Sequence, residues 1–231
     1  MISGQEHRVA TLASNSGANV LRSVASSLLT VALPFLLARL LSAQAYSAWV
    51  LLFGMAAYVI YFDLGLQPVV QSMVARFVGT NDRESTRDVV GAALRLMGLV
   101  VICCLPVACI VSAAIKSFFP GLPDGVLVDF QIAFVVTVCG QLAILISNVV
   151  MAYHAGKQQL VKPSFLVGAS RLGALLGAAA AAAFTNNLTV TSIALTLPLL
   201  IGLGILIWRL RGNLAEYRGS LREPMIVRYL G

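Results

Sequence analysis

Long apolar runs alternate with short polar segments along the whole chain. A helix that crosses the hydrocarbon core of a bilayer needs about 20 mostly apolar residues, and six stretches meet that requirement. These stretches are residues 18–41, 46–69, 89–117, 130–153, 164–184 and 188–210. Asn186 and Asn187 divide the last two, because the apolar run around them is too long for one span. The pattern therefore predicts an all-α integral membrane protein folded as a bundle of six transmembrane helices.

The composition agrees with this prediction. Hydrophobic residues make up 59% of the chain and charged residues 11%, whereas soluble domains are roughly a quarter charged. The net charge of +7 would favour nucleic acid as a partner if the cations formed one patch, but they are scattered at the ends of apolar runs. That distribution is typical of membrane topology and argues against a nucleic-acid partner.

The cations also predict an orientation. With the exception of Arg39 and Lys116, every lysine and arginine lies in or near the segments that would share one side of the membrane. Because cytoplasmic loops carry the excess of Lys and Arg, we expect both termini in the cytoplasm.

Polar side chains within the predicted spans are the candidate substrate-binding residues. They are Arg22, Ser26, Thr30, Arg95, Gln141, Asn148 and Arg171. The first three belong to one stripe with Ser23 and Ser27, at three- and four-residue spacing. Ionisable groups in spans are costly and usually face a bundle interior or a wet cavity. Two alternatives stay open: arginines can snorkel to the interface, and small polar side chains can join neighbouring helices.

The fifth predicted span differs from the others, because Gly173 and Gly177 give it a Gly-x-x-x-Gly pattern. Small residues at this spacing let helix backbones approach closely. For this span we expect helix packing and no binding role.

Asp63 is the only acid within the predicted spans. A turn near Ala43 would make the first two spans an antiparallel hairpin, with Arg22 21 residues before the turn and Asp63 20 residues after it. At equal rise per residue the two side chains would reach a similar depth. We therefore expect Arg22 and Asp63 to approach each other near the cytoplasmic end. Two roles are open to Asp63, ion coupling or an ion pair with Arg22.

Several short motifs follow one another in a fixed order along the chain. They are Asn19 and Arg22, Pro34, Leu41-Ser42, Tyr46 and Trp49, Asp63-Leu64-Gly65-Leu66, Ala75, Asn81-Asp82, and the segment from Tyr153 to Gln158 with Lys162-Pro163 after it. This order resembles the polysaccharide and O-antigen flippases of the multidrug/oligosaccharidyl-lipid/polysaccharide (MOP) exporter superfamily. Ser47 departs from it, since a glycine after the tyrosine is common in that family.

The resemblance implies one lobe of a two-lobed exporter. Residues 1–210 would form the N-terminal lobe, and residues 211–231 a cytoplasmic linker and amphipathic tail that lead toward an absent second lobe. In the family, two bundles flank a cavity that opens to alternate sides of the membrane. Cationic side chains there meet the pyrophosphate of an undecaprenyl-linked glycan, a role that the resemblance gives first to Arg22 and then to Arg95 and Arg171.

The resemblance also implies a setting for the protein. It places the chain in the bacterial cytoplasmic membrane, where it would translocate a lipid-linked oligosaccharide for polysaccharide or lipopolysaccharide biosynthesis. Its partners would be membrane lipids, the undecaprenyl-pyrophosphate-linked glycan, and either a second copy or the missing C-terminal half.

Other functions stay open beside this one. Half of a multidrug exporter of the MATE type would need acidic cavity residues for cationic drugs, and Asp63 alone is available. A non-transporting scaffold or remnant in glycan assembly would also fit a single lobe. An enzyme is not expected, because the sequence shows no paired carboxylates, nucleophile–histidine pair or phosphate loop. We likewise expect no metal and no cofactor.

Overall fold

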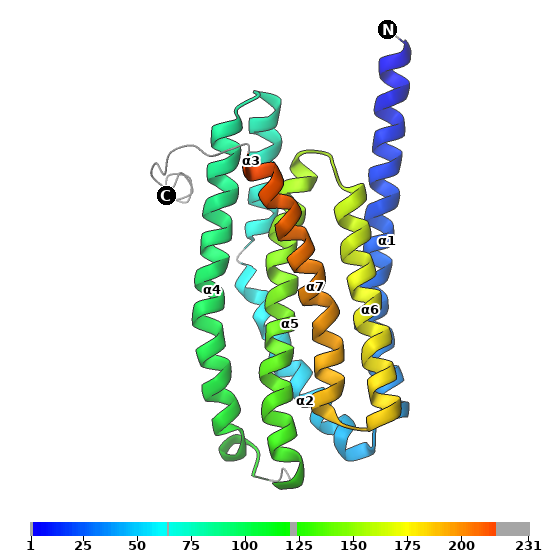
Figure 1. The fold of residues 1–231 in the computed structure, drawn as a ribbon, viewed down its shortest axis with the longest axis vertical. Coiled ribbons are helices and arrows are strands. Elements are labelled where there is room, and N and C mark those ends of the chain that lie inside the picture. Colours follow the sequence, from blue (N-terminus) through cyan, green and yellow to red (C-terminus); the bar gives the residue numbers. More distant parts are fainter. Residues whose placement is uncertain (1, 64, 121–123, 216–231) are drawn as a thin grey trace.

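The computed structural model describes residues 2–63, 65–120 and 124–215. This part of the chain consists of α-helices and one 3₁₀-helix, with no strand (Figure 1). The elements are α1 (Ile2–Leu40), α2 (Ala43–Ala57), the 3₁₀-helix η1 (Tyr58–Asp63), α3 (Leu66–Gly79), α4 (Arg83–Phe118), α5 (Asp124–Gly156), α6 (Val161–Thr185) and α7 (Leu188–Ala215). Within the described ranges, 6 segments are long and apolar enough to cross a membrane. The predicted all-α fold with six spans is confirmed.

The predicted tail is only partly covered by the structure. Residues 211–215 continue α7, and residues 216–231 lie outside the described residues. The prediction of a linker and amphipathic tail is therefore not tested.

The second span is not the single helix that the apolar run predicts. It extends from Ala43 to Gly79 and is divided into α2, η1 and α3. Gly65 lies just before α3 with a φ of 71°, a left-handed conformation that costs little for glycine. Pro68 follows in the first turn of α3, where its missing N–H removes no helical hydrogen bond. The break is thus encoded by a glycine and a proline inside an otherwise apolar run.

Helix α5 is the central element of the bundle. It contacts α2, η1, α3, α4 and α7, and a larger share of its span is buried than in any other span among the described residues. Glycines let its neighbours come close: a Cβ on Gly177 of α6 would lie 2.9 Å from the backbone oxygen of Ala194 in α7. A Cβ on Gly173 would lie 3.4 Å from Pro198. The predicted packing role of Gly173 and Gly177 is confirmed.

The first two spans do not form the expected hairpin. Helix α1 packs along α6 and makes few contacts with α2, so that α1 and α4 lie at opposite edges of the bundle in Figure 1. A Cβ on Gly168 of α6 would lie 3.8 Å from the Cα of Arg22 and 3.9 Å from the Cβ of Ala25, which shows how closely α6 approaches α1. The packing partner of α1 is therefore α6, with its small residues, and not the second span as the hairpin prediction had it.

The expected approach of Arg22 and Asp63 is therefore wrong. Arg22 donates from Nη2 to Oδ1 of Asn19 at 3.0 Å. Oδ1 of Asp63 is buried without a hydrogen-bond partner among the described residues. Equal depth along two helix axes does not bring side chains together when a gap separates the helices.

The helices also begin earlier than the sequence predicts, and this brings further acids into the spans. Asp129 lies in α5, where Oδ2 accepts a hydrogen bond from Asn187 Nδ2 at 3.2 Å and Oδ1 accepts one from Thr189 Oγ1 at 3.1 Å. Asp63 is consequently not the only acid within a span, as the predicted boundaries had suggested. Asp129 ties α5 to the start of α7.

The turn between α3 and α4 is capped by an acid. Asn81 adopts a φ of 55°, and Asp82 caps α4 by accepting hydrogen bonds from the backbone N and the hydroxyl of Ser85 at 3.0 and 2.7 Å. These hydrogen bonds hold the pKa of the Asp82 carboxyl below its ordinary value, because they favour the charged form. The cap fixes the point at which α4 begins.

Candidate functional site: a cationic cavity beside α1

A cavity of about 530 Å³ occupies the space that separates α1 from α2, η1 and α3. Its polar lining consists of Arg22, Ser23, Ser26, Ser27, Thr30, Gln67, Gln141, Asn148 and Arg171. Its apolar lining consists of Leu29, Phe53, Ala57, Ile60, Ile144, Leu195 and Leu199. Charged and amide groups and apolar side chains thus share one wall, which suits a ligand that is itself amphipathic.

Six of the seven candidate binding residues line this cavity. They are Arg22, Ser26, Thr30, Gln141, Asn148 and Arg171, and they come from α1, α5 and α6. Helical spacing explains the first three, because residues four apart share a face of α1. Their role in binding stays a prediction, since the structure shows where they lie and contains no ligand.

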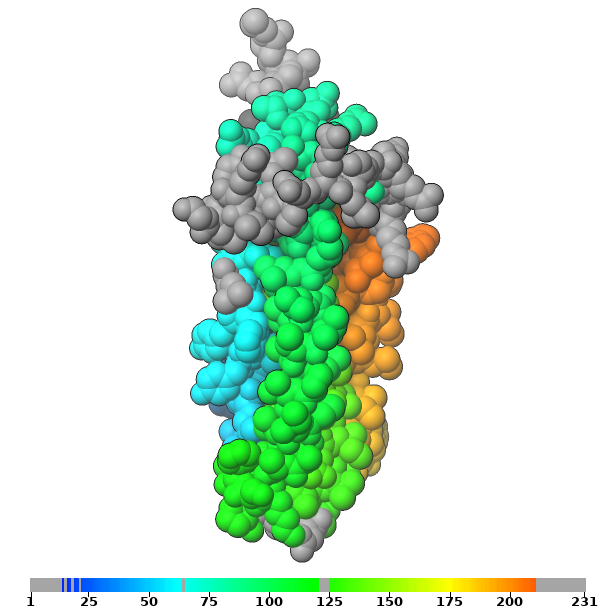
Figure 2. Space-filling view, turned by 90° about the vertical axis from the view of Figure 1, so that its left-hand side faces the viewer, coloured from blue at the N-terminus to red at the C-terminus, as the bar shows by residue number. Residues whose placement is uncertain are grey.

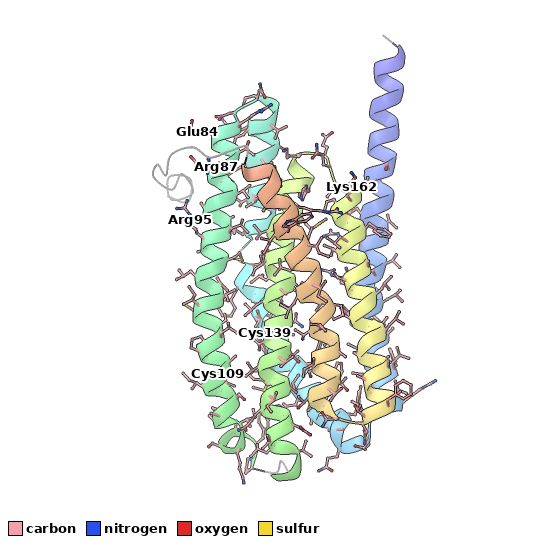
Figure 3. The ribbon with its side chains drawn as sticks, viewed as in Figure 1. Glu84, Arg87, Arg95, Cys109, Cys139 and Lys162 are labelled. Carbon is pink, nitrogen blue, oxygen red and sulfur yellow. The ribbon has the colours of Figure 1, made fainter. Side chains whose placement is uncertain are left out.

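Arg95, the seventh candidate, does not line the cavity. Its side chain is exposed on α4, and its Nε donates to the backbone oxygen of Gly91 at 3.2 Å. Leu99 and Ile102, one and two turns further along α4, are 56% and 69% exposed, so this face of α4 points outward. Figure 3 shows Arg95 at the edge of the bundle, on the side of α4 remote from α1 and α6.

Two arginines are held in place by neighbouring polar groups. Arg171 Nη1 donates to the hydroxyl of Ser26, and that hydroxyl donates to the backbone oxygen of Arg22 at 2.7 Å. Arg22 is oriented by Asn19, while its Nε is buried with no partner among the described residues. The contact between Ser26 and Arg171 joins α1 to α6, so the packing of these helices sets the positions of both guanidinium groups.

The hydroxyls of Ser26 and Thr30 already donate to the helix backbone and have no donor left for a ligand. Thr30 Oγ1 donates to the backbone oxygen of Ser26 at 3.0 Å, one turn back, as Ser26 does to Arg22. The hydroxyls of Ser23 and Ser27 make no hydrogen bond within the described residues, and neither do the carboxamides of Gln67, Gln141 and Asn148. With the guanidinium groups, they are the donors that remain for a ligand. These groups match phosphate oxygens and sugar hydroxyls.

The electrostatics of the cavity have one sign. Its lining includes Arg22 and Arg171 and no acidic side chain. Both arginines are half-buried, and two cations without an anion in a partly desolvated site are unfavourable until an anion binds. The arrangement favours an anionic ligand and disfavours a cationic one.

Asp63 lies close to the cavity without lining it. It ends η1, and its carboxylate accepts a hydrogen bond from the backbone N of Gln67, a residue of the cavity wall. The sequence reasoning missed Gln67 as a lining residue. The break of the span at Gly65 and Pro68 was the signal that could have found it, because interrupted helices often border binding sites in transporters.

Comparisons with known proteins define what this fold is similar to. No protein-family model matches the chain, and no curated protein matches it either. A solved structure described as the outward-facing conformation of a multidrug resistance MATE family transporter of the MOP superfamily is similar, with a TM-score of 0.63 and 17% sequence identity. The match covers 87% of this chain and 44% of that chain. The chain therefore has the fold of one lobe of a MOP-type transporter and spans less than half of the transporter that it matches.

Proposed function

We propose that this chain is one lobe of a MOP-type transporter that moves a lipid-linked oligosaccharide across a membrane by alternating access. The observation that carries the proposal is the cavity, in which Arg22 and Arg171 face the same space with no acidic side chain in its lining. Arginine binds phosphate oxygens in bidentate geometry and keeps its charge in a partly desolvated site. The pyrophosphate of an undecaprenyl-linked glycan is a ligand of that kind.

The rest of the cavity wall suits the other parts of such a ligand. Gln67, Gln141 and Asn148 offer hydrogen bonds to sugar hydroxyls. Phe53, Ile60 and other apolar side chains offer a surface for the first units of a hydrocarbon chain. A cationic cavity lowers the cost of carrying a diphosphate past the hydrocarbon core.

The proposed transporter includes a second lobe. The similar transporter is more than twice as long as the segment that matches, and α1 and α2, which flank the cavity on one side, make few contacts with each other within the described residues. A second copy of the chain, or a C-terminal half, would close that side. Two such bundles are related by an axis along the membrane normal in several transporter folds.

The proposed setting is the bacterial cytoplasmic membrane with both termini on the cytoplasmic side. The arginines and lysines that the positive-inside rule assigns to the cytoplasm lie near the end of α3, at the start of α4, between the end of α5 and the start of α6, and toward the end of α7. The cationic end of the cavity would then face the compartment in which lipid-linked precursors are made.

A MATE-like multidrug exporter is the second candidate, and the similar solved structure favours it. Such a function would call for a site that attracts organic cations. Arg22 and Arg171 repel them, and Asp63, whose carboxylate accepts a hydrogen bond from the backbone of Gln67, lies outside the lining. A membrane scaffold that transports nothing is the third candidate, and it predicts no ligand-dependent property of the cavity.

The test is binding of an undecaprenyl-pyrophosphate oligosaccharide to the full chain in nanodiscs, followed by flipping of that lipid in proteoliposomes. Arg22→Ala and Arg171→Ala should each weaken binding by roughly tenfold or more, and Arg95→Ala is the matched control because Arg95 lies outside the cavity. Equal binding by all three variants would overturn the proposal. Binding of an organic cation that Asp63→Asn abolishes would favour the multidrug exporter.

A further inference from the structure

A second concave region lies on the opposite side of η1 from the cationic cavity. It is a groove of about 450 Å³ whose walls come from α2 and η1 on one side and α4 on the other, with α5 as its floor. Helix α3 packs on α4, whereas α2 makes few contacts with α4. Helices α2 and α4 therefore diverge on the α2 side of the break in the second span, and the groove lies between them. Figure 2 shows part of the α2–η1–α3 segment (cyan) beside α4 (green) in the middle of the molecule.

The chemistry of the groove is uniform. Its lining is aliphatic and aromatic apart from the thiols of Cys103 and Cys104 and the hydroxyl of Tyr58, and no charged or amide side chain contributes to it. The floor is formed by Phe134 and Val138, which are 5% and 2% exposed. The groove therefore offers apolar contact on three sides and no charged or amide group to anchor a ligand.

The depth of the groove identifies the medium that faces it. Its residues on α4 lie between Cys103 and Val111, roughly 10 to 22 Å from the end of the helix at Phe118 at about 1.5 Å per residue. The hydrocarbon core of a bilayer is about 30 Å thick, and all the lining residues belong to segments that can span it. At this depth, the acyl chains of the bilayer are the molecules available to fill the groove.

The size of the groove distinguishes an acyl chain from a protein segment. A helix about 10 Å across would fill 450 Å³ with roughly one turn, so a partner helix cannot enter between α2 and α4. A single hydrocarbon chain is thin enough to lie along the groove and reach its floor. Filling the groove with apolar contacts stabilises the complex, because an empty recess leaves its lining without dispersion partners.

We propose that this groove is a binding site for one acyl chain of a bilayer phospholipid, lodged between η1 and α4 on the floor of α5. The site is separate from the cationic cavity: Met55, Tyr58 and Phe62 face the groove, while Ala57 and Ile60 of the same segment face the cavity. An acyl chain in the groove packs against Met55, Tyr58 and Phe62 and so stabilises the broken span on its groove side.

The test uses the full chain in nanodiscs that contain a phosphatidylethanolamine with a diazirine in the middle of one acyl chain. After illumination, cross-linked residues are mapped by mass spectrometry. We expect cross-links on Phe134 and Val138, which lipid that merely surrounds the protein cannot reach. Cross-links on exposed residues such as Ile102 and Ile110, with none on Phe134 or Val138, would overturn the proposal.

A pair of variants tests occupancy directly. Val107 lines the groove and is 57% exposed, whereas Ile110 on the same helix is 67% exposed and does not line it. Val107→Trp should fill the groove and reduce cross-linking of Phe134 by roughly tenfold, and Ile110→Trp should leave it unchanged. The proposal would be contradicted if Val107→Trp left the cross-linking of Phe134 unchanged. It would also be contradicted if Ile110→Trp reduced that cross-linking as much as Val107→Trp does.

The outcome is independent of the proposed transport function. The probe is a phospholipid without a glycan or pyrophosphate, and Arg22→Ala should not change the cross-links on the floor of the groove. Failure of glycolipid binding with intact groove cross-linking would overturn only the transport proposal. Loss of groove cross-linking with intact glycolipid binding would overturn only this inference.

Discussion

The cationic cavity and the apolar groove share one wall and have similar volumes, about 530 and 450 Å³, yet their chemistry is opposite. The cavity has two arginines and three carboxamides, and the groove has no charged or amide side chain. The broken second span lies between them and faces both. The interrupted span therefore borders a polar space on one side and an apolar recess on the other.

The largest expected effect would cancel the net positive charge of the cavity without touching the groove. Arg171→Glu places an anion beside Arg22 and in the space that the ligand phosphate would occupy. We expect binding of the diphosphate lipid to weaken by roughly 100-fold, as the loss of a charge-assisted contact implies. Binding in nanodiscs measures this, with cross-linking of the groove floor as the control. An unchanged affinity would show that the cavity does not recognise the phosphate by charge.

The tight packing behind the cavity gives the next effect. Gly177→Val would push side-chain atoms into the backbone of Ala194, 2.9 Å from the position of the new Cβ. We expect the free energy of unfolding to fall by about 1–3 kcal/mol, the usual cost of overpacking. Thermal unfolding in detergent measures it, with Gly98→Val of α4 as the control because no atom lies within 4 Å there. Equal destabilisation by both substitutions would contradict the packing argument.

A smaller effect should follow from removing the support of Arg171. Ser26→Ala deletes the hydroxyl that accepts from Arg171 and joins α1 to α6, and we expect about 1 kcal/mol of diphosphate-lipid binding to be lost. Ser26→Thr keeps the hydroxyl and should restore affinity. Ser23→Ala is the matched control, since Ser23 lines the same cavity and its hydroxyl makes no hydrogen bond within the described residues. If Ser23→Ala weakens binding as much as Ser26→Ala, the support by Ser26 is not specific.

The smallest effect lies outside both concave regions, at the cap of α4. Because the pKa of Asp82 is lowered in the folded protein, its contribution to stability is present above the ordinary value of about 3.9. That contribution is lost as the pH falls through the lowered folded value. Asp82→Asn should therefore reduce the loss of thermal stability on acidification. Melting temperatures between neutral and acidic pH measure this, and identical pH profiles for the two proteins would contradict it.

The sequence predicted much of the cavity wall, for a simple reason. Residues three and four apart share a helix face whatever the tertiary structure, so Arg22, Ser26 and Thr30 share one face of α1. For the same reason Gln141 and Asn148 share one face of α5. It could not choose between Arg95 and Arg171. Both lie near the end of a span that the sequence assigns to the cytoplasm, and only the rotation of each helix against its neighbours turns Arg171 inward and Arg95 outward.

The sequence by itself determined six apolar spans, the short turns between them and the polar stripe of α1, because hydrophobic length and helical period are local properties. The tertiary structure alone decided that α1 packs on α6 and not on α2, since Gly168 permits close approach there. That choice separates Arg22 from Asp63, brings Arg22 and Arg171 to one cavity, and leaves the groove beside η1 open to the bilayer. Lateral packing of helices depends on side chains far apart in the chain, and neither the span pattern nor the rise per residue contains it.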